Sequence, residues 1–382
     1  MKTNNNIPAY RFQGYTDAWE LRKLVNEVLF IGTGKSKFSA LEFGEFEILG
    51  STSVIGYDNS YDYEGDFILT ARVGANAGEL YRHSGKVKIS DNTVFIQGDG
   101  LDFIFYILQH FDIKKLSFGT GQPLVKASEL KELKIFMPVS VKERNHIGTF
   151  FSTLDRQITL HQRKLDTLKE QKKTYLKLLF PAKGQTKPAL RFQGFEDDWK
   201  EVKLGEVLIK NSKRNKDLRI INVESVSNRL GFVKQTEQFE DYSVASSDLS
   251  NYYVISEKQF AYNPSRINVG SIAYKKLGEE SSVVSPLYVS FSTSENVEDY
   301  YLWYWFKTEL FHSQRIVFSE GGVRDTLSYN QLSEIILSLP SLPEQEVIGT
   351  FFSTLDQEIA QVEDKLASLK EMKKTLLRKL FV

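Results

Sequence analysis

One stretch of this chain carries residue types that bind phosphate groups in other proteins, but it lacks a part that the chemistry requires. The run Ile31-Gly32-Thr33-Gly34-Lys35-Ser36 matches the end of the phosphate-binding pattern Gly-x4-Gly-Lys-Ser, which needs a further glycine where this chain has Leu29. Without that glycine the backbone lacks the freedom to wrap around a phosphate group. The stretch therefore does not predict an NTPase.

Two other kinds of catalytic chemistry also lack support. The run Tyr262-Asn263-Pro264-Ser265 is similar to the Asn-Pro-Pro-aromatic motif of adenine methyltransferases, but Ser265 and Arg266 replace the second proline and the aromatic residue that would stack on a base. The five histidines have no His-x-x-x-His spacing and there is no cysteine, so neither a zinc hydrolase nor a thiolate metal site is indicated. We expect no catalytic residues and no metal site, and hence a protein that is not itself an enzyme.

The remaining candidates are polar and basic residues in glycine-containing loops. Arginine and lysine suit the edges of guanine, asparagine and glutamine suit adenine, and glycine lets a loop approach a phosphate group closely. The candidate DNA-binding residues are Lys35, Lys37, Arg72, Asn76, Thr120 and Gln122 in the first half of the chain, and Lys213, Arg214, Lys216, Arg266, Asn268 and Arg324 in the second half. For any one of them the alternative is an ordinary surface loop, but the two sets fall at matching places in the two halves.

Two blocks of sequence occur twice and must position these loops. Residues 147–180 align without a gap to residues 348–381, with 21 of 34 positions identical. A shorter block, 8–24, is repeated at 188–204. Similar blocks around dissimilar segments predict that the chain consists of two related halves with pseudo-twofold symmetry. We therefore expect the end of the chain to lie near its first block, as residue 181 lies near residue 188.

Each copy of the longer block predicts a long helix. A Ser-x-x-Glu pattern, a typical capping box, opens each one at Ser140 and Ser341. Apolar residues then recur at alternating spacings of three and four, as in a coiled coil. The series is interrupted at His161, Lys172 and Lys373, and we interpret His161 as a polar residue that adjusts helix register rather than as a functional site. Two such helices in one chain most simply bury their apolar faces against each other, antiparallel.

The two segments between the blocks, about 25–138 and 205–339, differ from each other. Both contain short runs of Tyr, Phe, Ile and Val broken by Gly, Asn, Asp and Ser, and each has one helical stretch, at 101–111 and 299–311. Both patterns indicate mixed α/β domains, and residues 181–188 have the composition of a linker.

Composition is ordinary for a cytoplasmic protein. The 382 residues include 49 basic and 49 acidic side chains, and no apolar stretch is long enough to span a membrane. The absence of cysteine fits a reducing compartment. We expect cytoplasmic localisation and no membrane contact.

Taken together, the repeats resemble those of the specificity subunits of type I restriction-modification systems. The resemblance is carried by the repeated Pro-Ala-x-Arg-Phe-x-Gly block (8–19 and 188–199), the Glu-x-x-x-Ile that starts each helix, Leu-Asp-x-x-Ile within it, and the Leu-Phe at its end. It covers the whole chain, with a small departure where Lys142 stands in the position that Pro343 holds in the second copy.

The resemblance implies a mixed α/β protein with two globular target recognition domains separated by two long antiparallel coiled-coil helices. The first domain with its repeated block would be 1–139, the first spacer helix and linker 140–187, the second domain 188–340 and the second spacer helix 341–382. Each domain would recognise one part of a bipartite site in double-stranded DNA, about one helical turn apart.

The resemblance also implies partners. Two methylation subunits would bind the conserved helices, and restriction subunits would join them, while S-adenosylmethionine, ATP and Mg would belong to those subunits and no cofactor to this chain. A neutral protein can act in this way because its partners share the phosphate contacts that supply most of the affinity. The alternative is a coiled-coil scaffold whose two modules bind something other than DNA.

Overall fold

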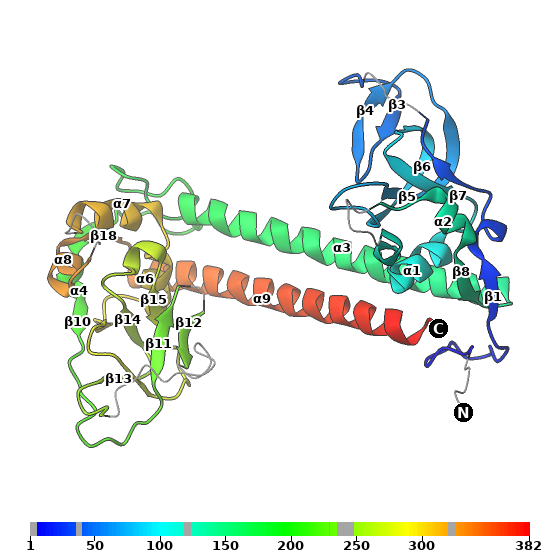
Figure 1. Cartoon of the computed structure of the whole chain (residues 1–382). Coiled ribbons are helices and arrows are strands. Elements are labelled where there is room, and N and C mark those ends of the chain that lie inside the picture. Colours follow the sequence, from blue (N-terminus) through cyan, green and yellow to red (C-terminus); the bar gives the residue numbers. More distant parts are fainter. Residues whose placement is uncertain (1–5, 36–39, 118–123, 229, 235–247, 320–325) are drawn as a thin grey trace. The chain divides into compact units, whose positions relative to one another are not determined.

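The structure is a computed structural model that divides into two compact units. It describes residues 6–35, 40–117, 124–228, 230–234, 248–319 and 326–382. Unit 1 comprises residues 1–163 and 363–382, and unit 2 comprises residues 164–362. Both boundaries fall inside a long helix, so each unit contains one globular domain and part of both long helices (Figure 1).

The domain of unit 1 is built on a six-stranded sheet in the order β2-β7-β5-β6-β3-β4, antiparallel except for the parallel pair β3 and β6. Alternate residues of its central strands face opposite sides, as a β-strand requires. Ile68 and Ile96 therefore pack toward helix α1, while Phe67 and Phe95 form a separate cluster on the other face. The elements are β2 (Phe30–Thr33), β3 (Phe46–Leu49), β4 (Val54–Asp58), β5 (Tyr63–Ala71), β6 (Leu80–Ile89), β7 (Thr93–Gln97), α1 (Asp102–Phe111), α2 (Ala127–Glu132) and the short 3-10 helices Leu24–Asn26 and Ile113–Ser117.

The domain of unit 2 has a four-stranded antiparallel sheet in the order β10-β17-β14-β15, with the hairpin β11–β12 and the pair β13–β16 beside it. Its elements are α4 (Leu204–Val207), β10 (Leu208–Lys210), β11 (Glu224–Ser227), β12 (Gly231–Lys234), β13 (Tyr253–Ile255), β14 (Gln259–Tyr262), β15 (Ile272–Tyr274), β16 (Ser282–Val284), β17 (Val289–Thr293), α6 (Asp299–Trp305), α7 (Glu309–Phe318), α8 (Tyr329–Glu334) and the 3-10 helix Ile267–Val269. The prediction of mixed α/β domains is confirmed.

The helical stretch predicted at 299–311 is interrupted. The chain leaves the helical path between Trp305 and Glu309, where the Thr308 side chain accepts a hydrogen bond from the Phe311 amide and begins α7. A threonine at this position competes for backbone hydrogen bonds and favours a new helix start over continuation.

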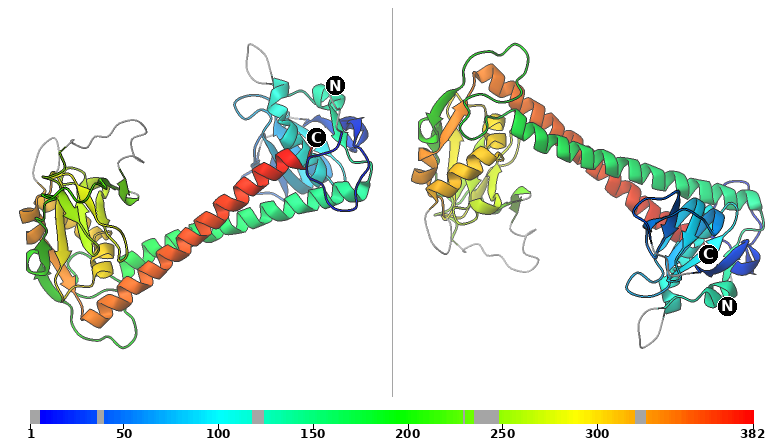
Figure 2. Two further views of the ribbon diagram at one scale, coloured as in Figure 1. Left: turned by 90° about the horizontal axis from the view of Figure 1, so that it is seen from below. Right: turned by 90° about the horizontal axis from the view of Figure 1, so that it is seen from above.

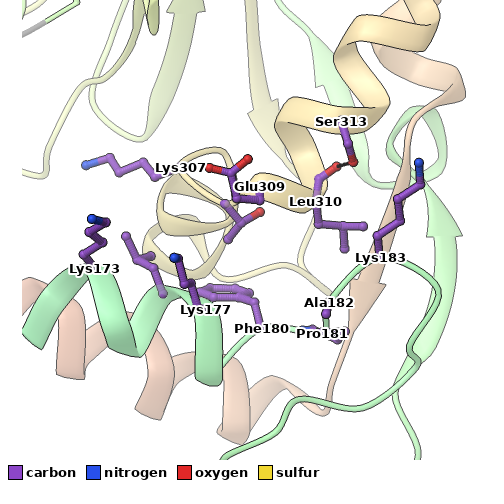
Figure 3. Close-up of a pocket in the computed structure, with 12 residues that line it drawn as sticks. Lys173, Lys177, Phe180, Pro181, Ala182, Lys183, Lys307, Glu309, Leu310 and Ser313 are labelled. Carbon is purple, nitrogen blue, oxygen red and sulfur yellow. Dashed lines mark hydrogen bonds between the residues drawn. The ribbon is translucent and has the colours of Figure 1, made fainter.

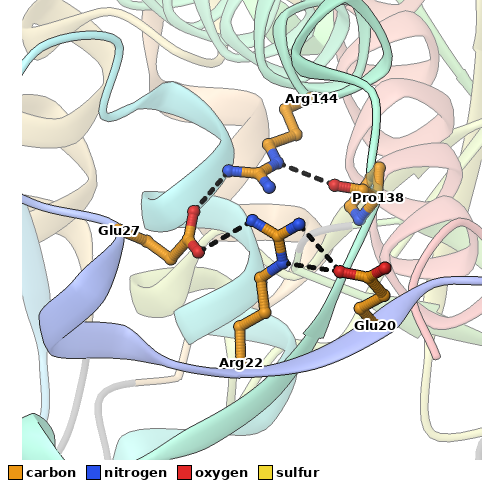
Figure 4. A network of polar contacts seen from close by, with 5 residues as sticks. All are labelled: Glu20, Arg22, Glu27, Pro138 and Arg144. Atoms are coloured by element: carbon orange, nitrogen blue, oxygen red, sulfur yellow. Dashed lines mark hydrogen bonds and ion pairs between the residues drawn. The ribbon is translucent and has the colours of Figure 1, made fainter.

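A short two-stranded sheet joins each repeated first block to the start of a long helix. In unit 1, β1 (Glu20–Lys23) pairs antiparallel with β8 (Lys134–Met137), and in unit 2, β9 (Lys200–Lys203) pairs antiparallel with β18 (Ile336–Leu339). In unit 1 a polar network reinforces this junction (Figure 4), because Arg144 donates to the Pro138 carbonyl at 2.8 Å and to Glu27, which also pairs with Arg22.

The two long helices are α3 (Val141–Leu178) and α9 (Leu342–Lys379), each an uninterrupted helix of 38 residues. Within each unit they pack antiparallel, as the heptad pattern predicts. Each lysine that interrupts the apolar series has an acidic partner on the other long helix. Lys373 pairs with Asp155 at 2.6 Å in unit 1, and Lys172 pairs with Asp356 in unit 2. These two pairs are related by the 201-residue repeat and show that both units use the same register.

His161 lies within α3 and contacts the backbone of its own helix. Its Nδ1 lies 2.8 Å from the Gln157 carbonyl oxygen of its own helix, and the ring is partly exposed. It contacts backbone of α3 rather than a cluster of titratable groups.

In each unit a buried ion pair joins the shorter repeated block to the first turn of a long helix. Arg11 binds both carboxylate oxygens of Glu143 at 2.7 and 2.8 Å, and Arg191 binds both oxygens of Glu344 at 2.7 Å. Bidentate pairs of this kind are strong and directional. Half of the predicted capping box is present in α3, where the Glu143 amide donates to the Ser140 hydroxyl at 3.4 Å. The glutamate side chains hold an arginine instead of reaching back to the helix start.

A glycine in each long helix allows a domain helix to approach closely. A Cβ on Gly148 would lie 2.8 Å from both the Phe103 amide nitrogen and the Asp102 Cβ, and one on Gly349 would lie 2.5 Å from a Glu298 carboxylate oxygen. The glycine of the identical run Ile-Gly-Thr-Phe-Phe therefore has a steric reason in both copies.

The predicted proximity of the chain end to the first block is confirmed. The Tyr10 amide donates to the Lys379 carbonyl at 2.8 Å, and the Leu190 amide donates to the Leu178 carbonyl at 2.8 Å in the other unit. Figure 2 shows the end of α9, in red, lying against the domain of unit 1. Each first block thus caps the end of a long helix in the same way.

Candidate nucleic-acid interface

In unit 1 the predicted loops meet at the turn between β6 and β7. The Gly34 amide donates to the Thr93 carbonyl at 3.1 Å, and the Arg72 amide donates to the Asn92 carbonyl at 2.9 Å. Lys35, Arg72 and Asn76 are exposed, and the Lys35 ammonium lies 5.7 Å from the centre of the Tyr63 ring. The loops therefore present basic and amide side chains to solvent from one end of the strands β2, β7 and β5.

Gly34 has a structural use here. A Cβ at this position would lie 2.1 Å from the Ile89 carbonyl oxygen, so only glycine fits. The incomplete phosphate-binding pattern thus marks a close approach of two backbones.

A further segment of unit 1 joins these loops. The Val125 amide donates to the Arg72 carbonyl at 2.8 Å, and Val73 forms an isolated bridge with Leu124. This contact places the chain that follows residue 123 beside the loop that carries Arg72.

Unit 2 repeats this arrangement although its sequence differs. The Leu327 amide donates to the Pro264 carbonyl at 3.2 Å, and the Leu327 carbonyl accepts from the Tyr262 hydroxyl at 2.9 Å. The loop after β14 therefore meets the chain that follows residue 325, as the loop after β5 meets the chain that follows residue 123. Arg266 and Asn268, which this loop carries, are both exposed.

The loop 211–216 is fixed to strand β13. The Val254 amide donates to the Lys213 carbonyl at 2.8 Å, and the Arg214 guanidinium donates to the Asn251 carbonyl at 2.7 Å while lying 5.1 Å from the centre of the Tyr253 ring. Lys213, Arg214 and Lys216 are exposed.

A hollow of about 390 Å³ brings these parts of unit 2 together. It combines the start of the loop 211–216, the loop after β14 and the chain near residue 327, and it is lined by Lys210, Asn211, Tyr253, Pro264, Pro286, Leu287, Tyr288, Val289, Ser290, Thr326, Ser328 and Tyr329. Its walls mix polar groups with aromatic rings and the apolar Leu287, which is 80% exposed. Such a mixture suits base edges and thymine methyl groups.

Sequence reasoning missed the aromatic lining of this hollow. Burial raises the pKa of Tyr329, so its hydroxyl remains a donor, here to the Leu208 carbonyl at 3.2 Å. The Lys210 ammonium lies 5.2 Å from the centre of the same ring. The only signal in the sequence was the frequency of tyrosine in the second segment.

Four candidate residues lie outside the described residues, namely Lys37, Thr120, Gln122 and Arg324. Within the described ranges, no group of three or more His, Asp or Glu side chains is arranged to hold a metal ion. No helix in the described part of the chain is long and apolar enough to cross a membrane.

The structure has two domains of related topology, each in a unit that contains part of both long helices. A family model described as the type I restriction modification DNA specificity domain matches residues 16–170 and again residues 196–371. The chain therefore belongs to the type I restriction-modification specificity family, and the resemblance found in the sequence is confirmed.

Individual relatives agree. The chain is 25% identical to the type I restriction enzyme EcoprrI specificity subunit of Escherichia coli over 150 residues, which is 36% of this chain and 37% of that protein. It is 24% identical to the MjaIX specificity subunit of Methanocaldococcus jannaschii over 356 residues, 83% of this chain and 77% of that protein. The crystal structure of a type I restriction-modification S subunit from M. genitalium superimposes with a TM-score of 0.66 at 17% identity, over 98% of this chain and 99% of that one, and shows the shared fold.

Proposed function

We propose that this specificity subunit binds a bipartite site in double-stranded DNA, with each domain recognising one part. The observation that carries the proposal is the repeated loop arrangement. In both domains the loop after an equivalent strand accepts a backbone hydrogen bond from the chain that precedes the long helix, at Arg72 in one domain and Pro264 in the other. The frame is conserved between the domains while the exposed side chains differ, as two modules with different base preferences require.

The repeated blocks and helices supply the proposed surface for two methylation subunits. In unit 1, residues of both blocks line a largely apolar groove of about 550 Å³ that includes Phe12, His146, Phe150 and Leu154. The Tyr15 hydroxyl lies 2.8 Å from the His146 ring nitrogen at its edge. Aromatic and aliphatic side chains with a polar edge are typical of protein interfaces.

The chain contributes recognition and the partners contribute chemistry in this proposal. Methyl transfer with S-adenosylmethionine, and ATP- and Mg-dependent cleavage with the restriction subunits, would take place outside this chain. The proposal places the complex in the cytoplasm, where its DNA is.

Selection from a random duplex library tests the proposal. The chain with its methylation subunits is incubated with random DNA, and the retained duplexes are sequenced. The proposal expects enrichment of two short motifs at a fixed separation. The scaffold alternative expects no enrichment of any sequence, and this result would refute DNA specificity.

A further inference from the structure

A second hollow of unit 2 lies at the start of helix α7 and is distinct from the hollow described above. Its volume is about 230 Å³. One wall is the loop after β14, with Asn268 and Gly270, and the other is the first two turns of α7, with Thr308, His312 and Arg315. The loop that carries the candidate residues Arg266 and Asn268 therefore also lines this hollow.

Arg315 is the unusual feature of the hollow. The residue is only 4% exposed, yet its Nε and Nη1 atoms have no hydrogen-bond partner within the described part of the chain. An unpaired buried cation is costly, and buried arginines are normally matched by an acceptor of opposite charge. Arg315 lines the hollow. A ligand with anionic oxygens bound there would offset the charge of the guanidinium, and a phosphate group is a common partner of arginine.

The helix start adds further donors. The amides in the first turn of a helix have no partner within the helix, and the helix dipole favours an anion there. In α7 the Thr308 hydroxyl accepts a hydrogen bond from the Phe311 amide. The Glu309 and Leu310 amides come before Phe311 in the same turn. Glu309 also lines the hollow and is the acidic residue of its wall, so its carboxylate opposes an anion.

Basic side chains surround the same point of the chain. A neighbouring cavity of about 510 Å³ shares Lys307, Thr308 and Glu309 with the hollow and is also lined by Lys173, Lys177 and Lys183 (Figure 3). The Lys307 ammonium lies 4.1 Å from the centre of the Trp303 ring. Burial and then the charge of Lys172 lower the pKa of Lys307 to about 7, with a smaller contribution from Lys276, while Asp356 acts in the opposite direction. The two linings together contain four lysines and Arg315 but one carboxylate, that of Glu309.

We propose that the hollow at the start of α7 binds a phosphate group through Arg315. The most direct source is a phosphate of the DNA backbone next to the bases that the loop with Arg266 and Asn268 contacts, and this source rests on the proposed function. A phosphate there would fix the position of the second domain on DNA without selecting a base.

The corresponding place in unit 1 has different chemistry. A smaller cavity of about 160 Å³ lies between the loop after β5 and the end of α1, and its lining includes Gln109 and Asp112 but no basic side chain. No side chain of that lining offers a cation to a phosphate group, so the proposed site has no counterpart in this cavity.

Thermal melting of the full-length protein in inorganic phosphate, against chloride at equal ionic strength, tests the hollow itself. The parent is expected to melt at a higher temperature in phosphate. Arg315→Met is expected to melt at or above the parent in chloride, because it removes an unpaired buried charge, and to lose the response to phosphate. Asn268→Asp, at an exposed position, places a carboxylate in the hollow and is expected to lose the response while folding normally. If both variants keep the parent's response, or if Arg315→Met lowers the melting temperature in chloride, the proposal is overturned.

A second measurement distinguishes the two sources of phosphate. Affinity for non-specific duplex DNA is measured as a function of salt for the complex with methylation subunits. Loss of one phosphate contact lowers the slope of log K against log salt by about 0.9, so Arg315→Met should show this decrease. Lys203→Met, which removes an exposed cation paired with Glu334 in the same unit, is the control and should not.

The outcomes separate this inference from the proposed function. A lost phosphate response with an unchanged slope supports the hollow and assigns it to a free phosphate compound, which refutes the backbone contact. If the parent complex does not bind DNA, the proposed function fails, and melting in phosphate still decides whether the hollow binds an anion.

Discussion

Replacement of Gly148 tests the close contact between a domain and the long helices. A Cβ at this position would lie 2.8 Å from the Asp102 Cβ and the Phe103 nitrogen, and 3.2 Å from the Asp102 carbonyl carbon. Carbon atoms in contact are normally about 3.5–4.0 Å apart, so α1 must move by roughly 1 Å relative to α3. These contacts involve backbone atoms of Asp102 and Phe103, which cannot rotate away as the end of a side chain can.

The magnitude follows from two opposing effects. Overpacking of this kind costs about 1–3 kcal/mol, whereas alanine in place of glycine inside a helix is favourable by about 1 kcal/mol. Gly148→Ala should therefore lower the free energy of unfolding by about 1 kcal/mol, and Gly148→Val, with two more carbons, by about 2–3 kcal/mol.

Urea denaturation followed by circular dichroism measures these values. Thr153→Ala is the control, since it is exposed on the same helix and should change the free energy of unfolding by less than about 0.5 kcal/mol. If Gly148→Ala is as stable as the parent or more stable, the close approach of the two helices is refuted.

Three further predictions concern the frame of the molecule. Leu165→Asp should cost several kcal/mol, because Leu165 is 6% exposed and an aspartate there would be a buried unpaired charge; a variant that melts like the parent would show that the apolar face of α3 is not buried. Glu344→Gln should lower the free energy of unfolding in urea by about 1–3 kcal/mol, because Arg191 loses its charged acceptor; Glu334→Gln, an exposed substitution, is the control. His110 should make stability pH-dependent: burial is the main cause that lowers its pKa in the folded state, so the unfolded chain binds the proton first, and stability should fall as pH decreases below about 6.5. Melting between pH 7 and 5 should show a smaller decrease for His110→Gln than for the parent, and equal slopes would contradict this assignment.

The long helices were predictable because their pattern is local. Apolar spacing of three and four over ten positions defines a buried face without knowledge of the partner, and the observed helices begin at Val141 and Leu342, within a residue of the predicted starts. The partners of the interrupting lysines were not predictable, because Lys172 and Asp356 are 184 residues apart and meet only in the folded chain.

The sheets and the recognition surface depended even more on distant contacts. No local signal indicates that β3 pairs in parallel with β6, or that the Glu at the start of each long helix binds the Arg of the first block. The candidate loops were found from residue type alone. In unit 1 the structure brings the loops of Lys35 and Arg72 together at the turn between β6 and β7. The aromatic hollow and the unpaired Arg315 could not be inferred, because both depend on burial by segments remote in sequence.

Mapping DNA methylation in a host that carries the complete system tests the central claim most directly. The parent protein is compared with Arg266→Gln and Arg72→Gln, each an exposed arginine in the equivalent loop of one domain. We predict a methylated site of two parts, with Arg266→Gln altering one part only and Arg72→Gln altering only the other. An undivided site, or either substitution altering both parts, would contradict the assignment of one part of the DNA site to each domain.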